Sequence, residues 1–154
     1  MQDKIVRLSV ITILALVFAL QSLAWLNHGN AFLCQWMHVN IFHLAANCWA
    51  LWSILRSRMM PSPYLLVVGV LFGWIGFLCT SNVMGFSGAL YAMLGIQWRY
   101  FHSWTNIIIT ASIFVLGIIL PQLTAVAHII PFALGLMFGY VYNFFKGYYY
   151  ETKR

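Results

Sequence analysis

Acidic residues are almost absent from this sequence. Asp and Glu together number 2 among 154 residues, and only 6% of the chain is charged, whereas 63% is hydrophobic. This balance excludes an ordinary soluble domain, which needs a charged surface around its core. We therefore expect an all-α membrane protein, because a chain this apolar must fold in lipid and helices satisfy their own backbone hydrogen bonds there.

Cysteine is also scarce, and its spacing excludes the usual cysteine sites. The 3 cysteines, Cys34, Cys48 and Cys79, show neither metal nor redox spacing. Cys34 and Cys79 are both expected toward the outer side and could form a disulfide, although a buried reduced thiol is the commoner state. A metal site would also lack an acidic ligand and a His-Glu-x2-His motif, so we expect no metal and no cofactor.

Long hydrophobic runs are what the sequence does contain. A helix needs about 20 apolar residues to cross a hydrocarbon core of ~30 Å, and proline and polar turns separate the runs. We predict a bundle of six transmembrane helices, forming one membrane domain over residues 1–154 with no soluble domain. The predicted spans cover about residues 8–26, 41–58, 64–80, 87–101, 105–120 and 126–145. The first run is long for a secretory signal and lacks a good cleavage site, so we interpret it as a retained anchor.

The basic residues predict the orientation of this bundle. All 8 fall on one side of a six-helix serpentine: Lys4, Arg7, Arg56, Arg58, Arg99, Lys146, Lys153 and Arg154. The positive-inside rule then places both termini in the cytoplasm of a multi-pass cell-membrane protein. The net charge of +6 reflects this topology, and we expect the lipid bilayer, not nucleic acid, as the partner of the basic side chains.

Few polar side chains lie inside the predicted spans, and they gather on the outer side. Ser87 opens the fourth span, His43 and Asn47 share one face of the second, and His128 lies near the start of the sixth. Polar groups at such depth are costly and usually mark function. The fourth span, about 15 residues or ~22 Å long, is shorter than the ~30 Å core. Ser87 should therefore lie below the outer surface in a hydrated pocket.

These residue types favour acyl transfer. A serine becomes a nucleophile when a neighbouring base takes its proton, and His128 is the candidate base for Ser87. His43 and Asn47, with the backbone N–H of Ser87, could stabilise the oxyanion of a tetrahedral intermediate.

Three further residues support this hypothesis. Gly85 and Gly88 remove side chains where the chain turns beside the serine, and Tyr91 could pack against the His128 ring. The only acids, Asp3 and Glu151, are expected in the cytoplasm, so the catalytic unit would be a Ser–His dyad. On its own, Gly-x-Ser-Gly is more often a helix-packing motif. A small transporter is a further alternative, but the internal repeats typical of that class are not evident.

The chain resembles the rhomboid family of intramembrane serine proteases. The matching motifs are His38-x4-His43-x3-Asn47, Gly85-x-Ser87-Gly88-x2-Tyr91, and Ala127-His128 followed by Gly135 and Gly139. The resemblance implies a six-helix bundle that cleaves single-pass transmembrane substrates near their outer ends, with substrate access between the second and fifth helices. It implies Ser87 as nucleophile, His128 as base, His43 and Asn47 in the oxyanion hole, and Tyr91 stacked on the histidine.

Two departures from the family pattern are visible. The first outer loop, about residues 27–37, is short and has no arginine, and Pro131 stands where the family commonly has a glycine. Because proline is tolerated in the first turns of a helix, we expect the sixth helix to begin nearer His128. The alternative function is that of a catalytically silent relative that binds transmembrane helices; such proteins usually lack the serine or histidine that this chain retains.

Overall fold

The computed structural model describes residues 2–21, 31–55, 60–80, 84–98, 108, 111 and 125–151. Within these ranges the regular structure is entirely helical, which confirms the predicted all-α class. The helices are α1 (Gln2–Gln21), α2 (Ala31–Cys34), α3 (Ile41–Ile54), α4 (Ser62–Leu78), α5 (Ser87–Ile96) and α8 (Ala125–Glu151). The predicted fifth span, 105–120, lies outside the described residues except for 108 and 111.

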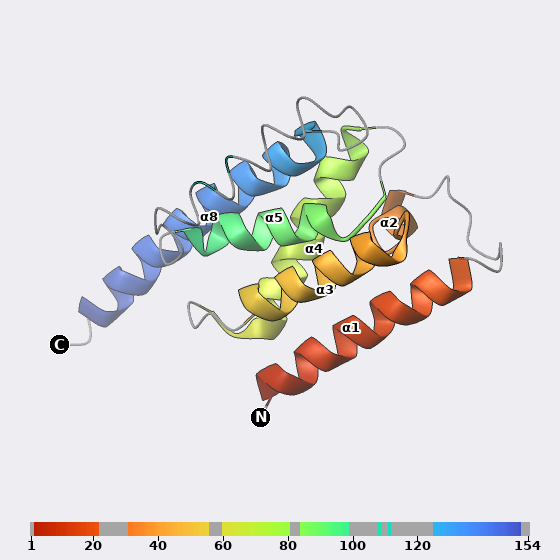
Figure 1. Cartoon of the computed structure of the whole chain (residues 1–154). Coiled ribbons are helices and arrows are strands. Elements are labelled where there is room, and N and C mark those ends of the chain that lie inside the picture. The colour runs from red at the N-terminus through yellow and green to blue at the C-terminus, as the bar shows by residue number, and fades with distance from the viewer. Residues whose placement is uncertain are drawn as a thin grey trace.

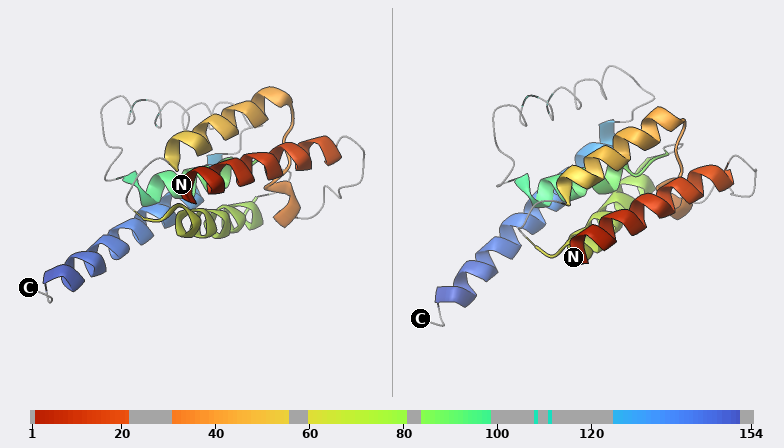
Figure 2. Two further views of the ribbon diagram at one scale, coloured as in Figure 1. Left: turned by 90° about the horizontal axis from the view of Figure 1, so that it is seen from below. Right: turned by 60° about the horizontal axis from the view of Figure 1, so that its bottom comes forward.

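Helix α5 lies at the centre of the bundle, with α4 and α8 packed against it and α3 and α1 on the opposite side from α8 (Figure 1). Helix α8 extends past the other helices at its C-terminal end, as both views in Figure 2 show. The central helix carries Ser87 at its first residue. The groups around that serine therefore come from the helices packed against α5.

Helices α1 and α4 run in the opposite direction to α3, α5 and α8. The side chain of Gln21, at the end of α1, hydrogen-bonds the backbone of His38 just before α3. At the other ends of the same two helices, the Arg7 guanidinium lies 4.5 Å from the centre of the Trp52 ring. Helices α1 and α3 are therefore antiparallel. The first residues of α3, α5 and α8 lie at the same end of the bundle as the last residues of α1 and α4 (Figure 1).

The ends of several helices follow from local chemistry. Asn40 caps α3, because its side-chain Oδ1 accepts a hydrogen bond of 2.9 Å from the backbone N–H of His43, as asparagine commonly does at a helix start. Pro61 is the N-cap of α4, where a missing N–H costs little. Helix α1 begins at Gln2, six residues before the predicted span, because Lys4 and Arg7 continue the helix beyond its apolar run.

Glycines allow α5 and α8 to pack backbone against backbone. A β-carbon at Gly135 would collide with the carbonyl oxygen of Ala92, and one at Gly139 would collide with that of Ile96. Such close approach is typical of small residues at helix interfaces in membranes. The two glycines therefore pack against the helix that carries Ser87, and their contacts fix the register between α5 and α8.

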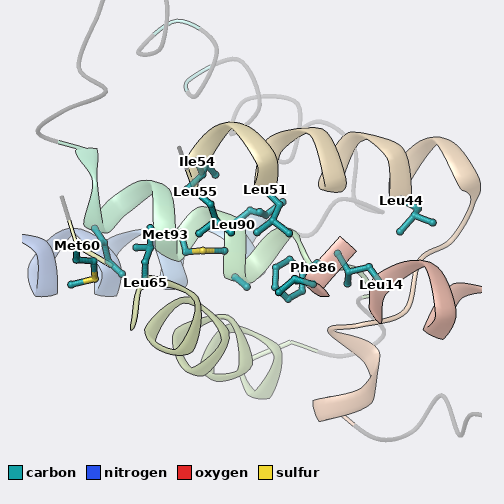
Figure 3. Close-up of a cluster of buried hydrophobic side chains, with 13 residues drawn as sticks. Leu14, Leu44, Leu51, Ile54, Leu55, Met60, Leu65, Phe86, Leu90 and Met93 are labelled. Carbon is teal, nitrogen blue, oxygen red and sulfur yellow. The ribbon is translucent and has the colours of Figure 1, made fainter. Parts of the chain in front are cut away.

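The core fills the space between α5 and its neighbours, and the outer surface is apolar as well. Leu14, Leu51, Leu65, Phe86 and Met93 are almost fully buried in one cluster (Figure 3). Several large apolar side chains of α3 and α8, among them Phe42, Trp49, Met137 and Phe144, are more than half exposed. An apolar outer surface of this kind is typical of a protein that faces lipid. Among the described residues, Lys4–Gln21 and Ala125–Lys146 are long and apolar enough to cross a membrane, and α3, α4 and α5 are shorter apolar helices.

Candidate active site

Ser87 and His128 meet at the same end of two parallel helices. Ser87 is the first residue of α5, and His128 lies in the first turn of α8. The Oγ atom of Ser87 lies 2.8 Å from the Nε2 atom of His128, within hydrogen-bond distance, although 41 residues separate the two in sequence. Both side chains are half-buried. The structure therefore brings together the predicted nucleophile and the predicted base.

The ring of Tyr91 packs against the imidazole of His128. Tyr91 lies one helical turn after Ser87 on α5, and its ring centroid is 4.8 Å from that of His128, with the rings tilted by 57°. Aromatic pairs at this separation attract each other. Because the tyrosine is buried, its ring is fixed by the core and limits rotation of the imidazole.

Gly85 shapes the turn that leads into Ser87. Its φ of +124° lies in a region that favours glycine, and its N–H donates a hydrogen bond of 3.0 Å to the carbonyl oxygen of Cys34. A β-carbon at this residue would lie 2.5 Å from Cε1 of His43 and 2.9 Å from its Nε2. The absence of a side chain thus lets α3 approach the loop before the serine.

The side-chain amide of Asn47 faces Gly85 in the turn before Ser87, as the His43 ring does. Its Nδ2 would lie 3.5 Å from a β-carbon at Gly85, one turn of α3 beyond the contact with His43. Asn47 is 6% exposed, and its Nδ2 has no hydrogen-bond partner within the part of the chain that the structure describes. A buried amide donor without a protein acceptor is rare and calls for an explanation. Here it can donate to a group bound beside Ser87.

Gly88 and Pro131 bring α4 and α8 close to the serine. A β-carbon at Gly88 would lie 3.3 Å from the Phe77 ring and 3.4 Å from the carbonyl oxygen of Ala127. Pro131 lies inside α8, six residues after its start at Ala125, so the expectation that this helix begins nearer His128 is wrong. The proline is accommodated because its ring packs against Gly76 of α4, which has no side chain to oppose it.

The three cysteines and the histidines form no second site among the described residues. None of Cys34, Cys48 and Cys79 is in a disulfide. Within the described ranges, no three His, Cys, Asp or Glu side chains gather as a metal ion would require. The hydrated pocket expected around Ser87 stays a prediction.

Three polar residues near this end of the bundle were not singled out from the sequence. Asn40 could have been found, because an asparagine just before an apolar helix is a helix-start signal. Gln21 and Gln35 gave no such signal. Gln35 is fully buried, and its Oε1 contacts Gly73 of α4 beside the first turn of α5.

All seven predicted site residues therefore lie around the first turn of α5. Ser87, Gly88 and Tyr91 belong to α5, Gly85 to the turn before it, and His43 and Asn47 to α3, while His128 comes from α8. No protein-family model, curated protein or solved structure matches this chain.

Proposed function

We propose that this protein is an intramembrane serine endopeptidase of the rhomboid type, which cleaves transmembrane segments with a Ser87–His128 dyad. The observation that carries the proposal is the 2.8 Å separation between Ser87 Oγ and His128 Nε2. A serine hydroxyl at this distance from an imidazole nitrogen can transfer its proton as it attacks a carbonyl carbon.

In the proposed reaction, Ser87 Oγ bonds to the carbonyl carbon of a substrate peptide while its proton moves to His128 Nε2. The tetrahedral intermediate collapses when the C–N bond breaks, and His128 returns the proton to the leaving amine. A water molecule then attacks the acyl-enzyme, gives a proton to His128, and releases the new carboxyl terminus with regeneration of the Ser87 hydroxyl.

The oxyanion of the intermediate would be held by groups from two elements. The backbone N–H of Ser87 lies at the positive end of α5, where helix N–H groups are unpaired. Asn47 supplies the buried amide donor that has no acceptor among the described residues, and the His43 ring lies against the same turn. Preorganised donors of this kind are worth about 10²–10³ in kcat each.

Both acidic residues of the sequence belong to helix ends away from the dyad. Asp3 lies in the first turn of α1, at the opposite end of that helix from Gln21. Glu151 ends α8, 23 residues after His128, which is about 35 Å along the helix. The tilted contact with Tyr91 would take over the orienting role that an aspartate has in a triad.

The proposed setting is a six-span, multi-pass protein of the cell membrane with both termini in the cytoplasm. Lys4 and Arg7 lie at the start of α1 and Lys146 near the end of α8, all far from the Ser87 end of the bundle. By the positive-inside rule, the Ser87 end then faces outward. The 10 residues of α5 measure about 15 Å, half of a ~30 Å core, which supports a serine below the outer surface. The substrates would be single-pass transmembrane proteins.

The proposal is tested with purified protein in liposomes and a fluorogenic transmembrane substrate. The parent and a Ser9→Ala control, whose serine is exposed on α1, should cleave the substrate. Ser87→Ala and His128→Ala should lose activity by at least about 10³-fold, and a fluorophosphonate probe should label Ser87 in the parent. Absence of both cleavage and labelling in the parent would overturn the proposal in favour of a silent protein that binds transmembrane helices.

A further inference from the structure

The carboxamide of Gln21 hydrogen-bonds both backbone polar groups of one residue, His38. Its Nε2 donates to the His38 carbonyl oxygen, and its Oε1 accepts a hydrogen bond of 2.9 Å from the His38 N–H. Gln21 is the last residue of α1, and His38 lies in the turn just before α3. Two hydrogen bonds to one residue fix both the position and the rotation of its backbone.

The ring of His38 packs against the ring of His43, so the position of His38 affects that of the His43 side chain. The His38 ring is completely buried, and its centroid lies 5.2 Å from that of the His43 ring, with the rings nearly edge to face at 67°. A buried ring cannot move without displacing its neighbours. The backbone of His43 is held independently, because Asn40 accepts its N–H, so contact with His38 acts mainly on the side chain of His43.

His43 also lies against the backbone turn that precedes the nucleophile. Its Cε1 and Nε2 atoms face Gly85, two residues before Ser87. The contacts therefore run without interruption from Gln21 through His38 and His43 to Gly85, and they join the end of α1 to the proposed oxyanion donors.

We propose that Gln21 is a positioning residue for the reaction, which holds His38 so that its ring keeps His43 aligned beside Ser87. The proposal rests on the proteolytic function proposed above. Gln21 touches neither Ser87 nor His128, so its loss should act through the geometry of the oxyanion donors. Because a small misplacement of such groups can cost about 10²-fold in rate, kcat should fall while substrate binding is kept.

The first variant is Gln21→Met, which keeps the length of the side chain and removes both hydrogen bonds. We expect kcat to fall by about 10-fold or more with KM within about 2-fold of the parent. The matched control is Asn143→Leu, which removes an amide hydrogen bond of 2.9 Å to the Gly139 carbonyl at the far end of α8. Similar loss of thermal stability in both variants, with kcat lowered only in Gln21→Met, is the expected result. Equal kcat in the two variants would overturn the proposal.

Gln21→Glu gives a signature that a purely structural role would not produce. An ionised carboxylate can still accept from the His38 N–H but repels its carbonyl oxygen, whereas the protonated acid restores the donor. The ratio of the kcat of this variant to that of the parent should therefore rise as pH is lowered. A ratio that does not change with pH would count against the proposal.

A measurement without turnover separates this inference from the proposed function. In protein labelled with ¹⁵N and ¹³C at its 5 histidines, Gln21→Met should shift the ring resonances of His38 and His43 and leave those of His128 in place. If the parent shows no Ser87-dependent cleavage, the proposed function fails, and this spectrum still decides whether Gln21 positions His43. Unchanged His43 resonances would overturn the role of Gln21 even in an active protease.

Discussion

The imidazole of His43 occupies the space that a side chain at Gly85 would need. A β-carbon there would lie 2.5 Å from Cε1 and 2.9 Å from Nε2 of that ring, closer than such atoms approach in proteins. This contact joins α3 to the turn before Ser87. Any change at residue 85 therefore acts on the proposed oxyanion donors and on the nucleophile together.

Gly85→Ala should strongly reduce cleavage without removing any functional group. The new methyl would push His43 away, and the φ of +124° would cost about 1–2 kcal/mol in a residue with a β-carbon. We expect kcat to fall by at least about 10²-fold and the melting temperature to drop, measured by cleavage in liposomes and by thermal unfolding in detergent.

The double variant Gly85→Ala/His43→Ala distinguishes the collision from the backbone strain. Removal of the ring opens space for the methyl, so the melting temperature should recover in part while activity stays low, because the His43 donor is gone. If the two stability effects simply add, the collision is not the cause.

Asn40→Ala should destabilise the first turn of α3, which carries His43. Loss of the bond from Asn40 Oδ1 to the His43 N–H should cost about 1 kcal/mol, the usual effect of removing a cap. Asn40→Asp and Asn40→Ser keep a capping oxygen and should retain most of the stability. Thermal unfolding of the three variants checks this, and equal loss in all three would contradict a capping role.

Much of this site was predictable because its chemistry requires residue types that lipid makes costly. Ser87, Asn47 and His128 stand out in the sequence because polar groups are rare in apolar runs, and the positive-inside rule predicts that they share one side of the bilayer. The helices follow from the apolar runs between proline and polar turns. The observed helix ends differ from the predicted ones by several residues. Helix α1, for example, continues through the basic residues Lys4 and Arg7, which lie outside the predicted apolar span.

The residues that escaped prediction act through backbone contacts. Gln21 binds the main chain of His38, and no sequence pattern indicates which backbone group a lone glutamine will reach. Pro131 was expected near a helix start, whereas it lies inside α8. Its place depends on Gly76 of another helix, and such a pairing between distant residues is visible only when the chain is folded.

The stability of the protein should fall in mild acid because of His38. Complete burial is the main cause that lowers the pKa of this side chain from 6.5 to about 4; the nearby His43 lowers the pKa further, and the Trp36 backbone opposes the shift. Because the folded-state pKa lies below the unfolded value, protonation favours the unfolded chain. The stabilisation is fully present above pH 6.5 and is lost as the pH falls to about 4, by roughly 2–3 kcal/mol.

Thermal unfolding of the parent and of His38→Phe between pH 4 and 7 measures this effect. The variant keeps a buried ring and cannot titrate at this residue, so its melting temperature should change less with pH than that of the parent. Identical pH dependence of the two proteins would assign the acid sensitivity to another group.

The contact between Gly76 and Pro131 sets the distance between α4 and α8 near His128. A β-carbon at Gly76 would lie 2.5 Å from Cγ and 2.9 Å from Cδ of Pro131, so Gly76→Ala should destabilise the protein. Pro131 follows His128 by three residues and lies on the same side of α8. A forced shift of the proline should therefore also move His128 away from Ser87 and lower kcat.

Pro131→Ala supplies the compensating change. It removes both colliding ring atoms and restores an N–H that can donate to the Ala127 carbonyl oxygen, the normal helical bond that proline prevents. The double variant Gly76→Ala/Pro131→Ala should then regain stability and kcat relative to Gly76→Ala, with a coupling of about 1–3 kcal/mol in unfolding free energy. Additive effects would mean that the two helices adjust independently. In that case the proline is not what keeps His128 within reach of the serine.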